Sequence, residues 1–312
     1  MTLTLARGGA SSDRHTTRHA DQVEPPQAVM VGPTQAVRTN RTGVIAPDAM
    51  ARTLAMCREY AAACEDLRVD RVRFVATSAS RDAGNAAEFV AGVAGAFERF
   101  GVTPQVVSGA QEAELSFLGA TGDLPAVGAP APYLVVDIGG GSTELVRGTD
   151  DVEAVLSVDV GCVRMTERHL RDDPPSAPQI AAATADIDAA IATAAEAVDL
   201  RAVRTLVGVA GSVTTVAAHL LGLPAYDAQA IHLSRARPAE VQRACADLLG
   251  MTRAQRAALA YLHPGRVDVI GAGALVWSRV IERVCRDSGL GPALPVLTSE
   301  HDILDGIALS LR

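Results

Sequence analysis

Lysine is absent from this sequence of 312 residues, and all 28 basic side chains are arginine. Without lysine the chain has no Walker A loop ending in GK[ST], no Schiff-base lysine and no protein-kinase ATP lysine. Aromatic residues are also scarce, at 3% of the chain, whereas 48% of the residues are apolar. That apolar content can form the cores of two ordinary domains, which excludes a chain that is disordered throughout.

Further absences limit the compartment and the partners. The five cysteines form no CxxC pair, and their odd number indicates reduced thiols, so we expect a cytoplasmic protein. The sequence has no signal-peptide core and no uninterrupted apolar run of about 18 residues, so we expect no membrane partner. A net charge of −8 argues against a surface that coats nucleic acid, so any phosphate recognition must be local.

The chain changes character after its first 42 residues. This leader contains no aromatic residue and no helical or strand periodicity, so we expect it to be poorly ordered. From Pro47 onward, helical patterns alternate with short β-rich runs such as Val72–Thr77, which predicts an α/β fold. A Gly/Pro/Ala stretch at residues 122–132 separates a second block, in which we expect further strands and helices, including a helix from about Arg266 to Val284.

The strongest motif is DIGGGSTE at residues 137–144, which directly follows the apolar run Leu134–Val136. Three consecutive glycines allow backbone N–H groups to point to one side and hold phosphate oxygens, and Ser142 adds a hydroxyl donor. Asp137, at the end of the strand, can hold a hydrated cation. The alternative is a glycine-rich hairpin turn without a ligand.

Two further segments support a phosphate site when they are considered together with that motif. GVAGSVTT at residues 208–215 also follows a strand but opens a helix, whose first N–H groups form an anion site. Alone it is a weak signal, because a Gly-Ser helix cap is common and usually structural. The segment Ser108–Gly119 carries Glu112 and Glu114 at a predicted helix start, where they are either dipole-stabilised carboxylates or include a general base.

Other polar side chains give weaker signals. Arg164, Arg168 and Arg171 lie on one helical stretch, which either approaches a long anionic substrate or is a solvated face. No pair of histidines has metal-ligand spacing with a carboxylate, so we expect structural roles for them. The cysteines are interpreted as small buried apolar side chains.

These motifs, in this order, resemble the exopolyphosphatase and guanosine pentaphosphate phosphohydrolase (Ppx/GppA) family. The resemblance runs from about Gly43 to Arg312 and includes ATSASRDAGN, SVDVGCVRMTERHL, DDPP, HPGRVDVIGAGA and SEHDILDG. The family is a branch of the acetate and sugar kinase, chaperone and actin superfamily, and this chain is similar to its short two-domain members.

The resemblance therefore implies two actin-like (ribonuclease H-like) domains. The N-terminal domain is expected at residues 43–110, with a C-terminal helix at 301–312 packing back on it, and the C-terminal domain at 111–300. Family members begin with a strand and the phosphate-binding motif D-x-G-[ST]-N-[ST], and no such segment precedes Pro47. The N-terminal domain is therefore expected to be incomplete.

The resemblance also assigns the site. It implies that Glu112 activates the attacking water and that Asp137 and Glu144 hold Mg²⁺. Gln111, beside Glu112, stands where an acidic residue is frequent in the family. The residues implied to contact phosphate are Gly139, Gly140, Gly141, Ser142, Gly211, Ser212, Arg81 and Arg266.

The expected function is an exopolyphosphatase, a phosphoanhydride hydrolase that releases the terminal phosphate of inorganic polyphosphate with Mg²⁺. A guanosine pentaphosphate 5′-phosphohydrolase is an alternative that the motifs do not separate from it, and the short family members suggest a homodimer. Losing a single preorganised donor lowers a rate by about 10²–10³-fold, so the missing N-terminal loop is expected to impair activity. A catalytically impaired module that binds polyphosphate or nucleotide is therefore a third interpretation.

Overall fold

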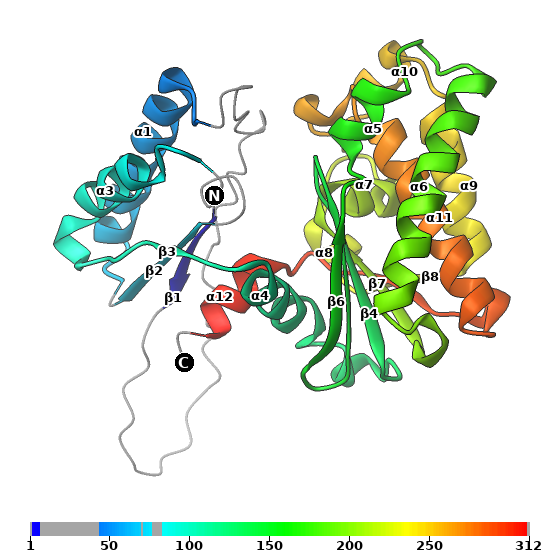
Figure 1. The fold of residues 1–312 in the computed structure, drawn as a ribbon, viewed down its shortest axis with the longest axis horizontal. Coiled ribbons are helices and arrows are strands. Elements are labelled where there is room, and N and C mark those ends of the chain that lie inside the picture. The colour runs from blue at the N-terminus through cyan, green and yellow to red at the C-terminus, as the bar shows by residue number, and fades with distance from the viewer. Residues whose placement is uncertain (1, 7–43, 70, 77–82, 311–312) are drawn as a thin grey trace. The chain divides into compact units, whose positions relative to one another are not determined.

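The computed structural model describes residues 2–6, 44–69, 71–76 and 83–310. The chain forms two compact units (Figure 1). Unit 1 comprises Met1–Glu112 and Leu304–Arg312, and unit 2 comprises Ala113–Ile303. Helix α4 (Gly109–Thr121) crosses from unit 1 into unit 2, and α12 (Ile303–Leu309) begins where the chain returns to unit 1.

Unit 1 is built on a small mixed sheet in the order β1–β2–β3. The strands are Thr2–Ala6, Arg71–Ala76 and Gln105–Val106; β1 is antiparallel to β2, and β3 is parallel to it. No strand is expected from the sequence before Pro47, and β1 shows that this expectation is wrong. The alternation in TLTLA is only five residues long, which is too short for periodicity to distinguish it from irregular chain.

Residues 7–42 of the leader lie outside the described residues, so their expected disorder stays a prediction.

The helices of unit 1 pack around aromatic rings. They are α1 (Pro47–Asp66), α3 (Ala86–Ala96) and the short 3-10 turn η1 (Glu98–Phe100). The ring of Phe74 on β2 lies 6.3 Å from that of Phe89 and 6.0 Å from that of Phe97, and all three are buried. The α1 face towards this core combines Met50 and Tyr60 with smaller side chains such as Cys57 and Cys64, so the helical pattern predicted from Pro47 is confirmed.

Unit 2 contains a six-stranded sheet in the order β6–β5–β4–β7–β9–β8. The neighbours β4, β7 and β9 are parallel, and β5, β6 and β8 are each antiparallel to their neighbours. The strands are β4 (Tyr133–Ile138), β5 (Thr143–Gly148), β6 (Val152–Val158), β7 (Thr205–Val209), β8 (Ser234–Ala236) and β9 (Val296–Thr298).

The helices of unit 2 lie on both faces of this sheet, with α6, α9 and α11 on one side and α4 on the other (Figure 1). The α-helices between α4 and α12 are α5 (Cys162–Arg168), α6 (Ala177–Ala197), α7 (Ala210–Leu220), α8 (Ala228–Ile231), α9 (Pro238–Gly250), α10 (Arg253–Ala257) and α11 (Ile270–Asp287). Four 3-10 turns complete the unit: η2 (Pro125–Val127), η3 (Leu200–Ala202), η4 (Pro264–Arg266) and η5 (Gly291–Ala293).

Strand β4 shows why helices are needed on both faces. Leu134 and Val136 pack into the core with α6, α7, α9 and α11, whereas Val135 packs with α4 through Ala113 and Phe117. Because alternate side chains of a strand point to opposite faces, a continuous apolar run requires two covering layers. The α/β fold predicted from the sequence is thus confirmed.

One helix begins later than the sequence predicts. The apolar pattern indicated a helix from about Arg266, but α11 starts at Ile270 and Arg266 ends the separate turn η4. The Nδ1 atom of His263 accepts a hydrogen bond from the N–H of Gly265 at 3.1 Å, which caps this turn locally. None of the helices in the described part of the chain combines the length and apolarity that a membrane crossing requires.

Candidate functional site

The two glycine motifs lie at the same edge of the unit 2 sheet. Strands β4 and β7 are parallel neighbours, with Asp137 paired to Val209, so the turns that follow them leave the sheet side by side. The first turn returns into the β4–β5 hairpin and the second opens α7, as the sequence predicted. Carboxyl ends of adjacent parallel strands are the usual ligand edge of an open α/β sheet.

The turn at residues 139–142 is held in shape by α5. The N–H of Gly139 donates to the carbonyl of Ser142 at 3.0 Å, and the N–H groups of Cys162 and Val163 donate to the carbonyls of Gly139 and Gly140. Gly161 lies so close that a Cβ there would come within 2.6 Å of the Gly140 backbone. The carbonyls of this turn are therefore directed towards the protein.

The N–H groups of the same turn are available to a ligand. Within the described residues, no acceptor faces the N–H groups of Gly140, Gly141 and Ser142. These residues are exposed or half-buried, so an anion can reach them from solvent. A set of successive amides of this kind suits phosphate oxygens, which favours the phosphate interpretation over a plain hairpin turn.

Asp137 and Glu144 are cross-strand partners at the base of this turn. They pair directly in the β4–β5 register, so their side chains project from the same face of the sheet. The Oε1 atom of Glu144 accepts a hydrogen bond from the Ser157 hydroxyl at 2.6 Å. Two carboxylates in directly opposite positions repel each other, and a shared divalent cation removes that repulsion.

The second turn has an unusual backbone and a close arginine. Ala210 adopts a left-handed conformation with φ of 66°, which costs a residue with a side chain about 1–2 kcal/mol. A Cβ on the next residue, Gly211, would lie 1.8 Å from Cζ of Arg266, so the guanidinium rests directly against this glycine. The structure therefore brings Arg266 to the Gly211–Ser212 turn.

Gly211 stands in the first turn of α7, whose first N–H groups have no partner within the helix. The positive guanidinium and the helix N-terminus thus form a site with a preference for negative charge. The neighbouring Ser212 is buried and hydrogen-bonds with the thiol of Cys162. Burial raises the pKa of Cys162, and Ser212 and Arg266 partly offset that rise.

Arg164 is attached to the first glycine turn. Its Nε donates to the carbonyl of Gly141 at 2.7 Å, and the same guanidinium lies 3.2 Å from Asp159. Arg168 instead pairs with Asp186 on α6. The two arginines thus have different roles: the first supports the turn, and the second joins two helices.

Glu112 stands in the first turn of α4, and the residue before it explains part of its placement. The hydroxyl of Ser108 accepts from the N–H of Gln111 at 3.2 Å, and Oε1 of Gln111 accepts from the N–H of Ser108 at 3.0 Å. This reciprocal pair is a capping box that fixes the start of the helix. Gln111 therefore has a structural role that an acidic residue would also fill.

The remaining predicted contacts fall in different parts of the molecule. Arg81 lies outside the described residues, so its phosphate contact stays a prediction. Glu112 belongs to unit 1, whereas all the other described candidate residues belong to unit 2.

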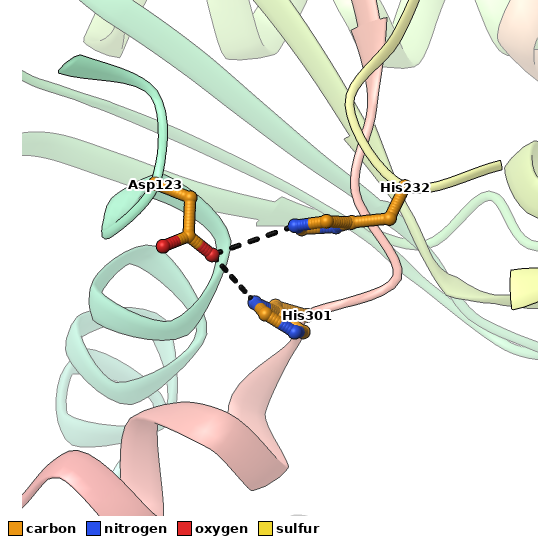
Figure 2. Close-up of side chains that lie close together, drawn as sticks. All are labelled: Asp123, His232 and His301. Atoms are coloured by element: carbon orange, nitrogen blue, oxygen red, sulfur yellow. Dashed lines mark ion pairs between the residues drawn. The ribbon is translucent and has the colours of Figure 1, made fainter. Parts of the chain in front are cut away.

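Sequence reasoning missed one group of polar side chains. Asp123, His232 and His301 converge in unit 2 from three separate segments, as Figure 2 shows. Spacing along the chain could not reveal them, because topology alone brings the segment after β9 beside the segment before β8.

Comparisons with known proteins identify one family over most of the chain. The model of the Ppx/GppA phosphatase family matches residues 34–289. Exopolyphosphatase 2 of Mycobacterium tuberculosis is 48% identical over 273 residues, which is 86% of this chain and 84% of that protein. The match to the family begins at residue 34, somewhat earlier than the resemblance read from the sequence.

Solved structures show the same fold. The crystal structure of an exopolyphosphatase-like protein has a TM-score of 0.79 at 44% identity, covering 87% of this chain and 86% of that chain. A PPX-GPPA enzyme of Aquifex aeolicus has a TM-score of 0.72 at 25% identity, covering 87% and 85%.

Proposed function

The chain belongs to the Ppx/GppA phosphatase family, and from this premise we propose that it is an exopolyphosphatase that releases the terminal phosphate of inorganic polyphosphate. The single observation that carries the proposal is the pair of glycine turns at adjacent strand ends, with Arg266 against the second. The relative named exopolyphosphatase 2 supports the choice of polyphosphate as substrate.

The terminal phosphoryl group would bind to the turn amides. The N–H groups of Gly140, Gly141 and Ser142 would donate to its oxygens, and the start of α7 with Arg266 would contact the next part of the anionic chain. Because the chain contains no lysine, guanidinium groups and backbone amides supply its positive and donor groups.

The reaction then needs only an aligned water and charge stabilisation. Glu112 is assigned as the base that takes a proton from water while the oxygen of that water forms a bond to the terminal phosphorus. The bond from phosphorus to the bridging oxygen breaks, and the electron pair leaves with the shortened polyphosphate. The products are orthophosphate and a chain one phosphate shorter.

The metal proposed for this site is Mg²⁺. In this proposal Asp137 and Glu144 are its ligands, because their cross-strand positions place two hard oxygen donors on one face of the sheet. When bound, Mg²⁺ would neutralise part of the charge that spreads over the phosphoryl oxygens. We further propose the actin-like, two-domain arrangement, a homodimer and a cytoplasmic location, in line with the family resemblance.

Phosphate release with two substrates tests this function. The full chain is assayed with Mg²⁺ on polyphosphate of defined length and on guanosine pentaphosphate. Faster release from polyphosphate is expected, and release from guanosine pentaphosphate alone would replace the proposal by the phosphohydrolase alternative. Binding of polyphosphate without any release would instead support an impaired binding module.

A variant pair tests the assigned base. Glu112→Gln should lower the rate about 10²–10⁴-fold, because the amide cannot take the proton of the water. Glu114→Gln is the matched control, since Glu114 is exposed on the same helix. Equal rates in the two variants would remove Glu112 from the mechanism while leaving the substrate assignment intact.

A further inference from the structure

Two histidines and an aspartate form a compact cluster in unit 2 that the proposed reaction does not use. Asp123 follows α4, His232 precedes β8 and His301 precedes α12 (Figure 2). The Oδ2 atom of Asp123 lies 2.9 Å from Nδ1 of His301 and 3.4 Å from Nε2 of His232. We propose that these three side chains bind a transition-metal ion of the zinc class.

The distances suit a tetrahedral ion. With bonds of about 2.0–2.1 Å, neighbouring ligand atoms around zinc lie about 3.3 Å apart. The two distances to the Asp123 oxygen are 2.9 and 3.4 Å, and all three ligand atoms lie within 4.8 Å of one another. Small rotations of partly exposed side chains are therefore enough to place all three around one ion.

The donor chemistry selects the class of ion. Imidazole nitrogens suit zinc, copper, nickel and iron, whereas Mg²⁺ prefers a shell of oxygen atoms and keeps several waters. The side chains of Asp123, His232 and His301 are 52%, 21% and 43% exposed, so an ion can enter from solvent and keep a water as its fourth ligand. This site is thus chemically distinct from the Asp137 and Glu144 pair.

One hydrogen bond must change when the ion binds. The N–H of Glu300 donates to Nδ1 of His232 at 3.3 Å, so the proton of that imidazole is on Nε2, facing Asp123. Coordination through Nε2 transfers this proton to Nδ1 and ends the contact with Glu300. The contact is long and therefore weak, and its loss provides a local signature of binding.

The ion would also stabilise unit 2. The three ligands lie in three separate connections, after α4, before β8 and after β9. A ligand that binds only the folded state raises the unfolding temperature in proportion to the logarithm of its concentration above the dissociation constant. The proposal does not depend on polyphosphate hydrolysis, because binding and unfolding are measured without substrate.

The test uses the full chain, free of metal and of any polyhistidine tag, titrated with ZnCl₂ by calorimetry. One zinc ion per chain and a rise in unfolding temperature are expected. Asp123→Asn and His301→Gln should each weaken zinc binding at least tenfold. His169→Gln is the matched control, since His169 also pairs with an aspartate, Asp186, but outside this cluster.

Two further measurements decide ambiguous cases. A shift of the Glu300 backbone amide on zinc addition, followed by NMR in the unaltered chain, supports the site even if a variant fails to fold. Unchanged affinity in Asp123→Asn and His301→Gln would overturn it. Loss of zinc binding in a His15→Gln, His19→Gln double variant with no effect at Asp123 would do the same, because the leader would then hold the metal.

Discussion

At Gly211 the space for a side chain is already filled by the guanidinium of Arg266. The clash of a Cβ with Cζ, at 1.8 Å, is with the far end of a flexible side chain, so the backbone can keep its conformation while the arginine moves away. Helix α7 can therefore form without a glycine at position 211, but the guanidinium of Arg266 can keep its position only if this residue is glycine.

Replacement of Gly211 by alanine should separate activity from stability. We expect Gly211→Ala to displace Arg266 and lose a charge-assisted contact of about 1.5–3 kcal/mol, which is about a 10- to 100-fold loss of phosphate release. The unfolding temperature should change little, because alanine favours helix while the arginine adjusts. Gly250→Ala is the control, since nothing lies within 4 Å of a Cβ there. Equal activity of the two variants would contradict the role of Arg266.

The β4–β5 hairpin carries both the proposed metal ligands, Asp137 and Glu144, and the proposed phosphate-binding turn. Its register places Asp137 opposite Glu144, and its turn is held by the first residues of α5. Such a hairpin carries a cost in like-charge repulsion when no cation is bound.

Removal of one of these charges should abolish the stabilisation by magnesium. Asp137→Asn is expected to unfold at the same or a higher temperature without metal, because the repulsion is relieved. The Mg²⁺-dependent rise in unfolding temperature should disappear with it, as measured by scanning calorimetry with and without the ion. Asp151→Asn, in the exposed β5–β6 turn, serves as the control and should keep that rise. A full magnesium response in Asp137→Asn would show that the ion binds elsewhere.

Helices α5 and α6 are joined by a single carboxylate. Nε2 of His169 lies 2.9 Å from Oδ2 of Asp186, and Arg168 pairs with the same oxygen. The hydrogen bond from His169, followed by that from Arg168, holds the pKa of Asp186 below its usual value. A lowered carboxyl pKa stabilises the fold above the unfolded-state pKa, and this contribution is lost as the pH falls through the folded-state pKa.

The pH dependence of the stability of an Asp186→Asn variant tests the contribution of these interactions with Asp186. At pH 7 it should be less stable than the unaltered chain by about 1 kcal/mol, since the pair is partly exposed to solvent. The difference should shrink as the pH falls below about 4, near the ordinary pKa of an aspartate. Urea unfolding across that range measures it, with Asp172→Asn as an exposed control. A difference that stays constant with pH would mean that packing, not charge, is lost.

At the scale of the whole molecule, four of the five thiols are buried. Cys57, Cys64, Cys162 and Cys245 are buried, and Cys285 is half-buried. Burial raises the pKa of Cys57 and of Cys64 from 9.0 to about 11, which lowers their thiolate fraction at pH 8 about a hundredfold.

A thiol reagent should distinguish the folded from the unfolded chain. We expect Ellman's reagent to react with at most one thiol quickly under native conditions, that of Cys285, and with all five in guanidinium chloride. Mass mapping of the modified peptides identifies the site. Rapid modification of Cys57 or Cys64 in the native chain would show that unit 1 opens readily.

Prediction from sequence succeeded where chemistry and local pattern coincide. The glycine turns after apolar strands were found because three adjacent glycines, or a Gly-Ser pair at a helix start, require a special backbone whatever surrounds them. It was less successful for short or capped elements. The strand Thr2–Ala6 was missed, and the start of α11 was placed at Arg266 because the apolar pattern does not separate the turn η4, which His263 caps, from the helix that follows it.

The sequence by itself determined the α/β class, the two glycine turns and the chemistry available without lysine, since these depend on residue type and local spacing. The tertiary structure alone decided that Arg266 rests on Gly211, that Asp137 faces Glu144, and that Asp123, His232 and His301 meet. The reason is physical: these contacts follow from strand order and register, which bring together residues that no local pattern along the chain connects.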